Sequence, residues 1–101
     1  MAVTIVTESN WEEIKASGKT VLLDFYAEWC VPCKRLGPVL DDISEENQDI
    51  TVGKINVENE PAIAEEFGVM SVPTLIVLKD GAETNKAVGF RTKAQIIDLL
   101  D

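Results

Sequence analysis

The apolar residues of this chain recur with two different periods, which predicts a protein built from both strands and helices. Residues 21–27 form a nearly continuous apolar run, typical of a central strand that is covered on both faces. The apolar residues at 36, 39, 40 and 43 recur at helical spacing and predict a helix from Cys33 to about Glu46. We expect these two segments to form the centre of the domain.

Three further helices are predicted from their boundary residues. Ser9 with Glu12, and Thr92 with Gln95, have the spacing of a capping box, which marks the start of a helix. A proline at position 61 and a glycine at position 68 bracket a short helix between them. The first of these helices is expected to turn Trp11 toward the core.

Four more strands complete the predicted order of elements. They are expected at residues 3–6, 51–57, 74–79 and 83–88. Asp80 and Gly81 predict a tight hairpin turn, so the last two strands must be antiparallel. The order β-α-β-α-β-α-β-β-α predicts a single α/β domain over residues 1–101, with a mixed sheet flanked by helices.

Composition and charge exclude several classes of function. With 18 acidic and 9 basic residues the chain has a net charge of -9, which repels nucleic acids and anionic membranes, so neither is expected as a partner. Two cysteines and no histidine are too few ligands for a structural zinc site, and no metal is expected. The N-terminal residues have no signal-peptide pattern, and no apolar run reaches the length of a membrane span, so a cytoplasmic protein is expected.

Cys30 and Cys33 are the candidate reactive groups. They lie where the central strand ends and the long helix begins, and a three-residue step brings their sulfurs within disulfide distance. The free NH groups and dipole of a helix N-terminus stabilise a thiolate, so Cys30 is expected to attack a partner's disulfide and Cys33 to resolve the mixed disulfide. A static disulfide, two inert thiols or half of an intermolecular zinc site are the alternatives.

Asp24 is a single acidic residue inside the central apolar run. Alternation along a strand places its side chain with Leu22 and Tyr26 rather than in solvent. A buried carboxyl has a raised pKa unless it is paired, and it can then exchange a proton near neutral pH. Asp24 is therefore a candidate base for Cys33; the alternatives are an aspartate at a locally hydrated position and a structural ion pair with Lys54.

Several separated motifs together resemble the thioredoxin family over essentially the whole chain. They are DFYAEWCVPCK at residues 24–34, Pro38, Val72-Pro73-Thr74, Gly81 and Gly89. The resemblance implies the thioredoxin fold, a five-stranded mixed sheet of order 1-3-2-4-5 with four helices. It also implies a cis peptide bond before Pro73, although the residues alone favour trans, the commoner form.

The resemblance also implies roles for individual residues. Asp24 is the buried proton-transfer acid and Lys54 its neighbour, and the backbone of Val72 pairs with an extended substrate segment. The residues implied to bind substrate proteins are Trp29, Pro32, Val72, Pro73 and Gly89, and Val31, between the cysteines, is expected to join them.

The activity implied is that of a protein-disulfide reductase, an electron carrier in cell redox homeostasis. It would have no bound cofactor beyond the Cys30–Cys33 disulfide, act as a monomer and be recharged by thioredoxin reductase. A disulfide oxidase or isomerase of an oxidising compartment, and a binding module of the same fold, are the alternative functions.

Val31 is a departure from the family pattern, which usually has glycine between the two cysteines. Valine is bulkier and stiffer, and its isopropyl group stands next to Cys30 in the sequence. We therefore expect a changed redox potential with an unchanged reaction.

Overall fold

A computed structural model of the chain describes residues 3–101 and contains the predicted order of elements. The strands are β1 (Val3–Ile5), β2 (Thr20–Tyr26), β3 (Ile50–Asn56), β4 (Thr74–Lys79) and β5 (Ala82–Val88). The helices are α1 (Glu8–Lys15), α2 (Val31–Glu46), α3 (Pro61–Glu66) and α4 (Lys93–Leu100). The predicted elements all exist, with boundaries that differ by a few residues.

The five strands form one mixed sheet of order β1-β3-β2-β4-β5, which confirms the predicted topology. Strand β2 is central: it pairs parallel with β3 and antiparallel with β4. The β4–β5 hairpin turns at Asp80 and Gly81, which both have positive φ as a two-residue turn of this kind requires. Consequently β2, β3 and β5 all end at the same edge of the sheet, and β4 begins there.

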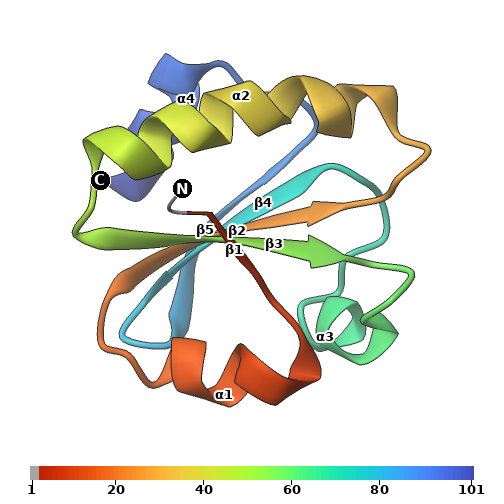
Figure 1. The fold of residues 1–101 in the computed structure, drawn as a ribbon, viewed down its shortest axis with the longest axis horizontal. Helices are drawn as coiled ribbons and strands as arrows, with labels where there is room; N and C mark the ends of the chain where they lie inside the picture. Colours follow the sequence, from red (N-terminus) through yellow and green to blue (C-terminus); the bar gives the residue numbers. More distant parts are fainter. Residues whose placement is uncertain (1–2) are drawn as a thin grey trace.

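Helices cover both faces of the sheet, with α2 and α4 on one face and α1 and α3 on the other (Figure 1). The alternating side chains of β2 enter two separate apolar clusters, because Leu23 and Phe25 pack with Trp11 while Leu22 packs with Leu36. The prediction that residues 21–27 form a strand covered on both faces is thereby confirmed.

The start of α1 differs from the prediction. The residue preceding the helix is Thr7, whose backbone NH donates to Asn10 Oδ1 at 2.8 Å, so the box is formed by these two residues. Ser9 and Glu12, which were expected to form it, both lie inside the helix. Three positions in this segment carry side chains suited to capping, and the spacing of Ser9 and Glu12 matched the motif equally well in sequence.

The other helix boundaries follow their signals closely. Thr92 and Gln95 form the predicted capping box of α4, with Gln95 Oε1 accepting from Thr92 N at 2.9 Å. Helix α2 starts two residues earlier than predicted, at Val31, and continues through Pro38 to Glu46. Cys30 is therefore the residue that caps α2, in the short segment that follows the central strand.

Candidate redox site

The two cysteines form a disulfide across the first turn of α2. Their Cα atoms are 5.2 Å apart, within the range that a disulfide spans. Cys30 Sγ accepts a hydrogen bond from the backbone NH of Cys33 at 3.2 Å. Both side chains are almost fully buried, at 4% and 3% exposure. The bridge is thus closed within one helical turn, and a backbone donor already points at one of its sulfurs.

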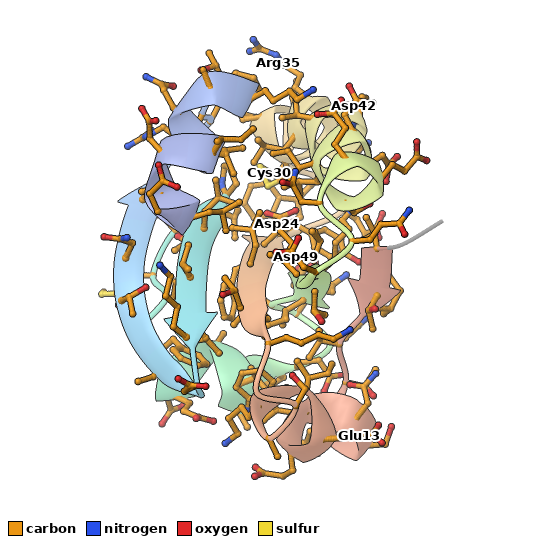
Figure 2. All side chains as sticks on the ribbon, turned by 90° about the vertical axis from the view of Figure 1, so that its left-hand side faces the viewer. Glu13, Asp24, Cys30, Arg35, Asp42 and Asp49 are labelled. Atoms are coloured by element: carbon orange, nitrogen blue, oxygen red, sulfur yellow. A yellow bond between two sulfur atoms is a disulfide. The ribbon has the colours of Figure 1, made fainter. Side chains whose placement is uncertain are left out.

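The carboxyl group of Asp24 lies on the face of the sheet that α2 covers. Figure 2 shows Asp24 and Cys30 inside the molecule. Asp24 is fully buried, and neither carboxylate oxygen has a hydrogen-bond partner among residues 3–101. This burial raises the pKa of Asp24 to about 7, while the charge of Lys54 acts in the opposite direction. The group therefore changes its charge near neutral pH.

Lys54 stands directly beside Asp24 because β2 and β3 pair these two residues in register. Its ammonium nitrogen lies 4.8 Å from the centre of the Tyr26 ring, a cation–π distance. No ion pair within 4 Å joins Lys54 to Asp24 in the described part of the chain. The alternative of a close structural ion pair is therefore not what the structure shows; the lysine acts on the carboxyl from a greater distance.

One side of the disulfide borders a small polar recess of about 150 Å³. Cys33 contributes to its wall, whereas Cys30 does not. The recess is lined by Tyr26, Ala27, Glu28, Cys33, Lys34 and Lys54. Burial, followed by the nearby charge of Glu28, raises the pKa of the Tyr26 phenol. Cys33 thus lies beside a hollow whose wall includes the charged residues Glu28, Lys34 and Lys54.

A larger apolar groove of about 370 Å³ lies near the disulfide. It is lined by Trp29, Val57, Val69, Met70, Ser71 and Val72. Trp29 is 69% exposed and Met70 is 96% exposed, unusual values for side chains of this size. Val57 and Val72 also pack against the buried cluster that contains both cysteines, so the groove adjoins the disulfide region.

The remaining predicted substrate-binding residues come from the start of α2, the segment before β4 and the segment after β5. Val31 is exposed and Pro32 follows it in the first turn of α2, while Pro73 is buried behind Val72. The Val72–Pro73 peptide bond is cis, which confirms the expectation from the family resemblance. Gly89, with φ of 96°, donates its backbone NH to the carbonyl oxygen of Pro73 at 2.8 Å. The structure therefore brings all of these residues to one edge of the sheet.

Several residues of the site were missed from the sequence. Val57, Val69, Met70 and Ser71 complete the groove, although in sequence they read as ordinary loop and strand-end residues. One signal in the sequence did point to the groove. Met70 is a large apolar residue two positions before Val72, and it lies between the predicted helix and the predicted strand, outside both. Tyr26, Glu28 and Lys34 were likewise not identified as neighbours of Cys33.

Residues 3–101 contain no group of three or more metal-ligating side chains. No helix in this part of the chain is long and apolar enough to cross a bilayer.

Comparison with known proteins identifies the family. The family model described as Thioredoxin matches residues 2–101. A thioredoxin of Chlamydia caviae is 44% identical over 99 residues, which are 98% of this chain and 96% of the relative. A thioredoxin of Staphylococcus haemolyticus is 43% identical and covers 100% of this chain and 97% of the relative.

A bifunctional thioredoxin reductase/thioredoxin of Mycobacterium leprae is 39% identical; the match spans 100% of this chain and 22% of that protein. Among solved structures, a mutant thioredoxin from Halobacterium salinarum aligns with a TM-score of 0.91 at 34% identity, covering 97% of this chain and 87% of that one. With its matching fold and its Cys30–Cys33 disulfide, the chain belongs to the thioredoxin family and is a thiol–disulfide oxidoreductase that reduces protein disulfides.

Proposed function

We propose that Cys30 is the attacking thiolate and Cys33 the resolving thiol of this reductase. Cys30 attacks one sulfur of a partner's disulfide, forming a mixed disulfide and releasing the partner's other sulfur as a thiolate, which takes up a proton. Cys33 then loses its proton and attacks the sulfur of Cys30, closing the intramolecular disulfide and releasing the second partner thiol. Two electrons pass to the partner, which gains two protons.

The observation that carries this assignment is the hydrogen bond to the first sulfur. Cys33 NH donates to Cys30 Sγ at 3.2 Å, and Cys30 occupies the capping position of α2. Free NH groups and the positive end of the helix dipole favour an anion at this position. A thiolate on Cys30 is therefore stabilised, and a thiolate is the nucleophile that this exchange needs.

The polar recess supports the second role. Cys33 forms part of its wall, and Lys54 of the same wall is paired in register with Asp24. With a pKa of about 7, Asp24 is ionised above neutral pH and is then able to accept a proton from Cys33. We assign Asp24 as this base and Lys54 as the group that modulates it.

The apolar groove supports substrate docking next to Cys30. Trp29 and Val72 are members of the groove, while Val31, Pro32, Pro73 and Gly89 lie around the cysteines. The backbone of Val72 precedes strand β4 and is suited to pairing with an extended segment of the partner. Partners are accordingly proteins that expose a disulfide within an extended, partly apolar segment.

A flavin-containing thioredoxin reductase is proposed as the electron donor. The relative from Mycobacterium leprae supports this pairing, because it is named as a bifunctional thioredoxin reductase/thioredoxin. We further propose that the protein is a monomer of the cytoplasm that serves electron transport and cell redox homeostasis as one compact unit over residues 1–101.

Insulin reduction tests the proposal. The wild type, with dithiothreitol as the electron source, is expected to accelerate the precipitation of reduced insulin, and Cys30→Ser to abolish the acceleration. The matched control is Ser44→Ala, which alters a buried residue near the opposite end of the same helix and should retain activity. No turnover by the wild type would contradict reductase function, and full activity of Cys30→Ser would favour a role in which the cysteines are incidental.

A further inference from the structure

The charges on α2 are arranged against the dipole of the helix. Its first ten residues, 31–40, carry Lys34 and Arg35 but no carboxylate, and residues 41–46 carry four carboxylates and no cation. A helix is stabilised by the opposite arrangement, by about 0.3–1 kcal/mol for each favourable charge. Helix stability therefore does not explain why cations are placed at the end of α2 that holds the disulfide.

Phe90, which follows β5, contacts two guanidinium groups near the N-terminal end of α2. Arg35 Cζ lies 4.6 Å from the centre of the Phe90 ring. Arg91 Nη1 donates to the carbonyl oxygen of Phe90 at 3.0 Å. Phe90 itself packs against the apolar cluster between the sheet and helices α2 and α4. Both guanidinium groups thus rest on a fixed support, which reduces the entropy that they lose when they bind a ligand.

The topology puts this arginine pair, Arg35 and Arg91, beside the disulfide. At the edge of the sheet that carries the site, the strand order is β3, β2, β4 and β5. Cys30 follows β2 and Pro73 precedes β4, so the disulfide region is central. The apolar groove includes Val57, which follows β3, whereas Phe90 follows β5. The two sets therefore lie toward opposite sides of the disulfide.

Backbone contacts tie the β5 side to the centre of the site. Gly89 N donates to the carbonyl oxygen of Pro73 at 2.8 Å. A Cβ atom placed on Gly89 would lie 3.5 Å from Arg91 Nη1, so this guanidinium borders the same loop. Arg35 comes two residues after Cys33, and Figure 2 shows its side chain at the surface of the molecule.

The charges of the arginine pair are not neutralised within the described chain. The ion pairs between residues 3–101 join Lys15 to Glu12 and Glu66, and Lys93 to Glu46. Neither Arg35 nor Arg91 is among them. On a protein with a net charge of -9, two cations without an ion-pair partner among residues 3–101 therefore lie at the end of the sheet that holds the disulfide.

We propose that the arginine pair binds a carboxylate of the partner protein that lies near the disulfide to be reduced. Guanidinium groups bind carboxylates through paired, charge-assisted hydrogen bonds, which ammonium groups do not match in geometry. The reductase therefore prefers disulfides with a nearby aspartate or glutamate on the side that faces β5. This inference rests on the proposed function, since it names the class of substrate for the same site.

The test uses single-turnover reduction of synthetic substrates, so that no external reductant takes part. Two short peptides, one carrying a fluorophore and the other a quencher, are joined by a disulfide and mixed with pre-reduced protein. The residue two positions before the attacked cysteine, or two positions after it, is varied among Glu, Gln and Lys. The second-order rate constant is measured for each peptide at low and high salt.

The peptides form two sets, with the varied residue either before or after the attacked cysteine. In one of these sets, the wild type is expected to reduce the Glu peptide faster than the Lys peptide. The expected difference is about twofold to fivefold for each arginine, as for exposed ion pairs, and it shrinks as salt is added. The double variant Arg35→Gln, Arg91→Gln should bring the rates together. Arg35→Lys keeps the charge without the planar group and should lose part of the preference.

Lys19→Gln is the matched control, because it removes one exposed charge before the start of β2, at the opposite end of the sheet. It should preserve the preference. Equal rates for all peptides with the wild type, or a full preference in the double variant or in Arg35→Lys, would overturn the inference. No reaction with any peptide would instead contradict the proposed function itself.

Discussion

The two hollows near the disulfide differ in chemistry. The apolar groove is the larger, at about 370 Å³ against about 150 Å³, and it displays exposed Trp29 and Met70. The polar recess has Cys33 in its wall together with Lys34 and Lys54. A surface that docks a partner has to be apolar and open, whereas a site of proton transfer needs polar groups and restricted access to solvent. We infer that partner docking and proton transfer take place on separate sides of the disulfide.

The largest predicted effect concerns the polar side, through Asp24. Its pKa is about 7 in the folded protein and near 3.8 when unfolded, so between these values only the folded state holds the proton. The free energy of unfolding therefore falls as pH rises through this window, by roughly 1.4 kcal/mol per pH unit. Asp24→Asn stays neutral, and we expect it to exceed the wild type by about 3–4 kcal/mol at pH 8.

Urea unfolding of the oxidised proteins between pH 4 and pH 8 measures this difference. Asp49→Asn is the control, because Asp49 is exposed and lies in the turn before β3. It should follow the pH dependence of the wild type. A constant difference in stability between Asp24→Asn and the wild type across this range would show that Asp24 does not titrate near neutrality.

A smaller effect is predicted for the apolar side, through Trp29. Trp29→Ala removes the exposed aromatic surface of the groove and should slow the reduction of an apolar disulfide peptide about tenfold, the equivalent of about 1.4 kcal/mol. The measurement is the single-turnover rate constant, which should respond little to salt. Ile5→Ala, which shortens an exposed apolar side chain on β1, is the control and should leave the rate unchanged.

Trp29 is exposed, so the same variant should unfold at nearly the wild-type urea concentration. An unchanged rate constant with Trp29→Ala would remove the groove from the account of docking, and the two hollows would no longer have separate roles.

The smallest effect is predicted for Val31, which lies between the two cysteines and is 65% exposed. Val31→Gly gives the first turn of α2 more backbone freedom when the disulfide is open, worth about 0.4–1 kcal/mol, and lets more water reach a thiolate on Cys30. Both changes favour the reduced form, so the potential should become less negative by roughly 10–20 mV. Redox equilibration with glutathione buffers measures it, and identical potentials would contradict this role of Val31.

Much of the fold could be predicted because its signals are local or periodic. The apolar run of β2 and the helical spacing in α2 defined the two central elements, and the Asp80-Gly81 turn defined the final hairpin. The predicted start of α1 was wrong because Thr7, Ser9 and Asn10 all carry side chains that cap helices. Only the path of the chain decides which of them occupies the position before the helix.

The site could be predicted in part for similar reasons. The position and spacing of Cys30 and Cys33 are visible in sequence, and the isolated acid Asp24 is conspicuous in an apolar run. The groove is assembled from segments after β3 and before β4, so Val57 and Met70 meet only in the folded chain. Arg35 and Phe90 likewise meet only in the folded chain. Arg35 Cζ lies 4.6 Å from the centre of the Phe90 ring, although the two residues are far apart in sequence.

Trapping of the mixed disulfide tests the central claim most directly. Cys33→Ser and Cys30→Ser are each reduced, mixed with a disulfide-linked peptide and followed by intact-protein mass spectrometry. We predict that Cys33→Ser rapidly accumulates a one-to-one adduct through Cys30, while Cys30→Ser forms it far more slowly. Faster adduct formation by Cys30→Ser would show that Cys33 is the attacking group and would contradict the assignment.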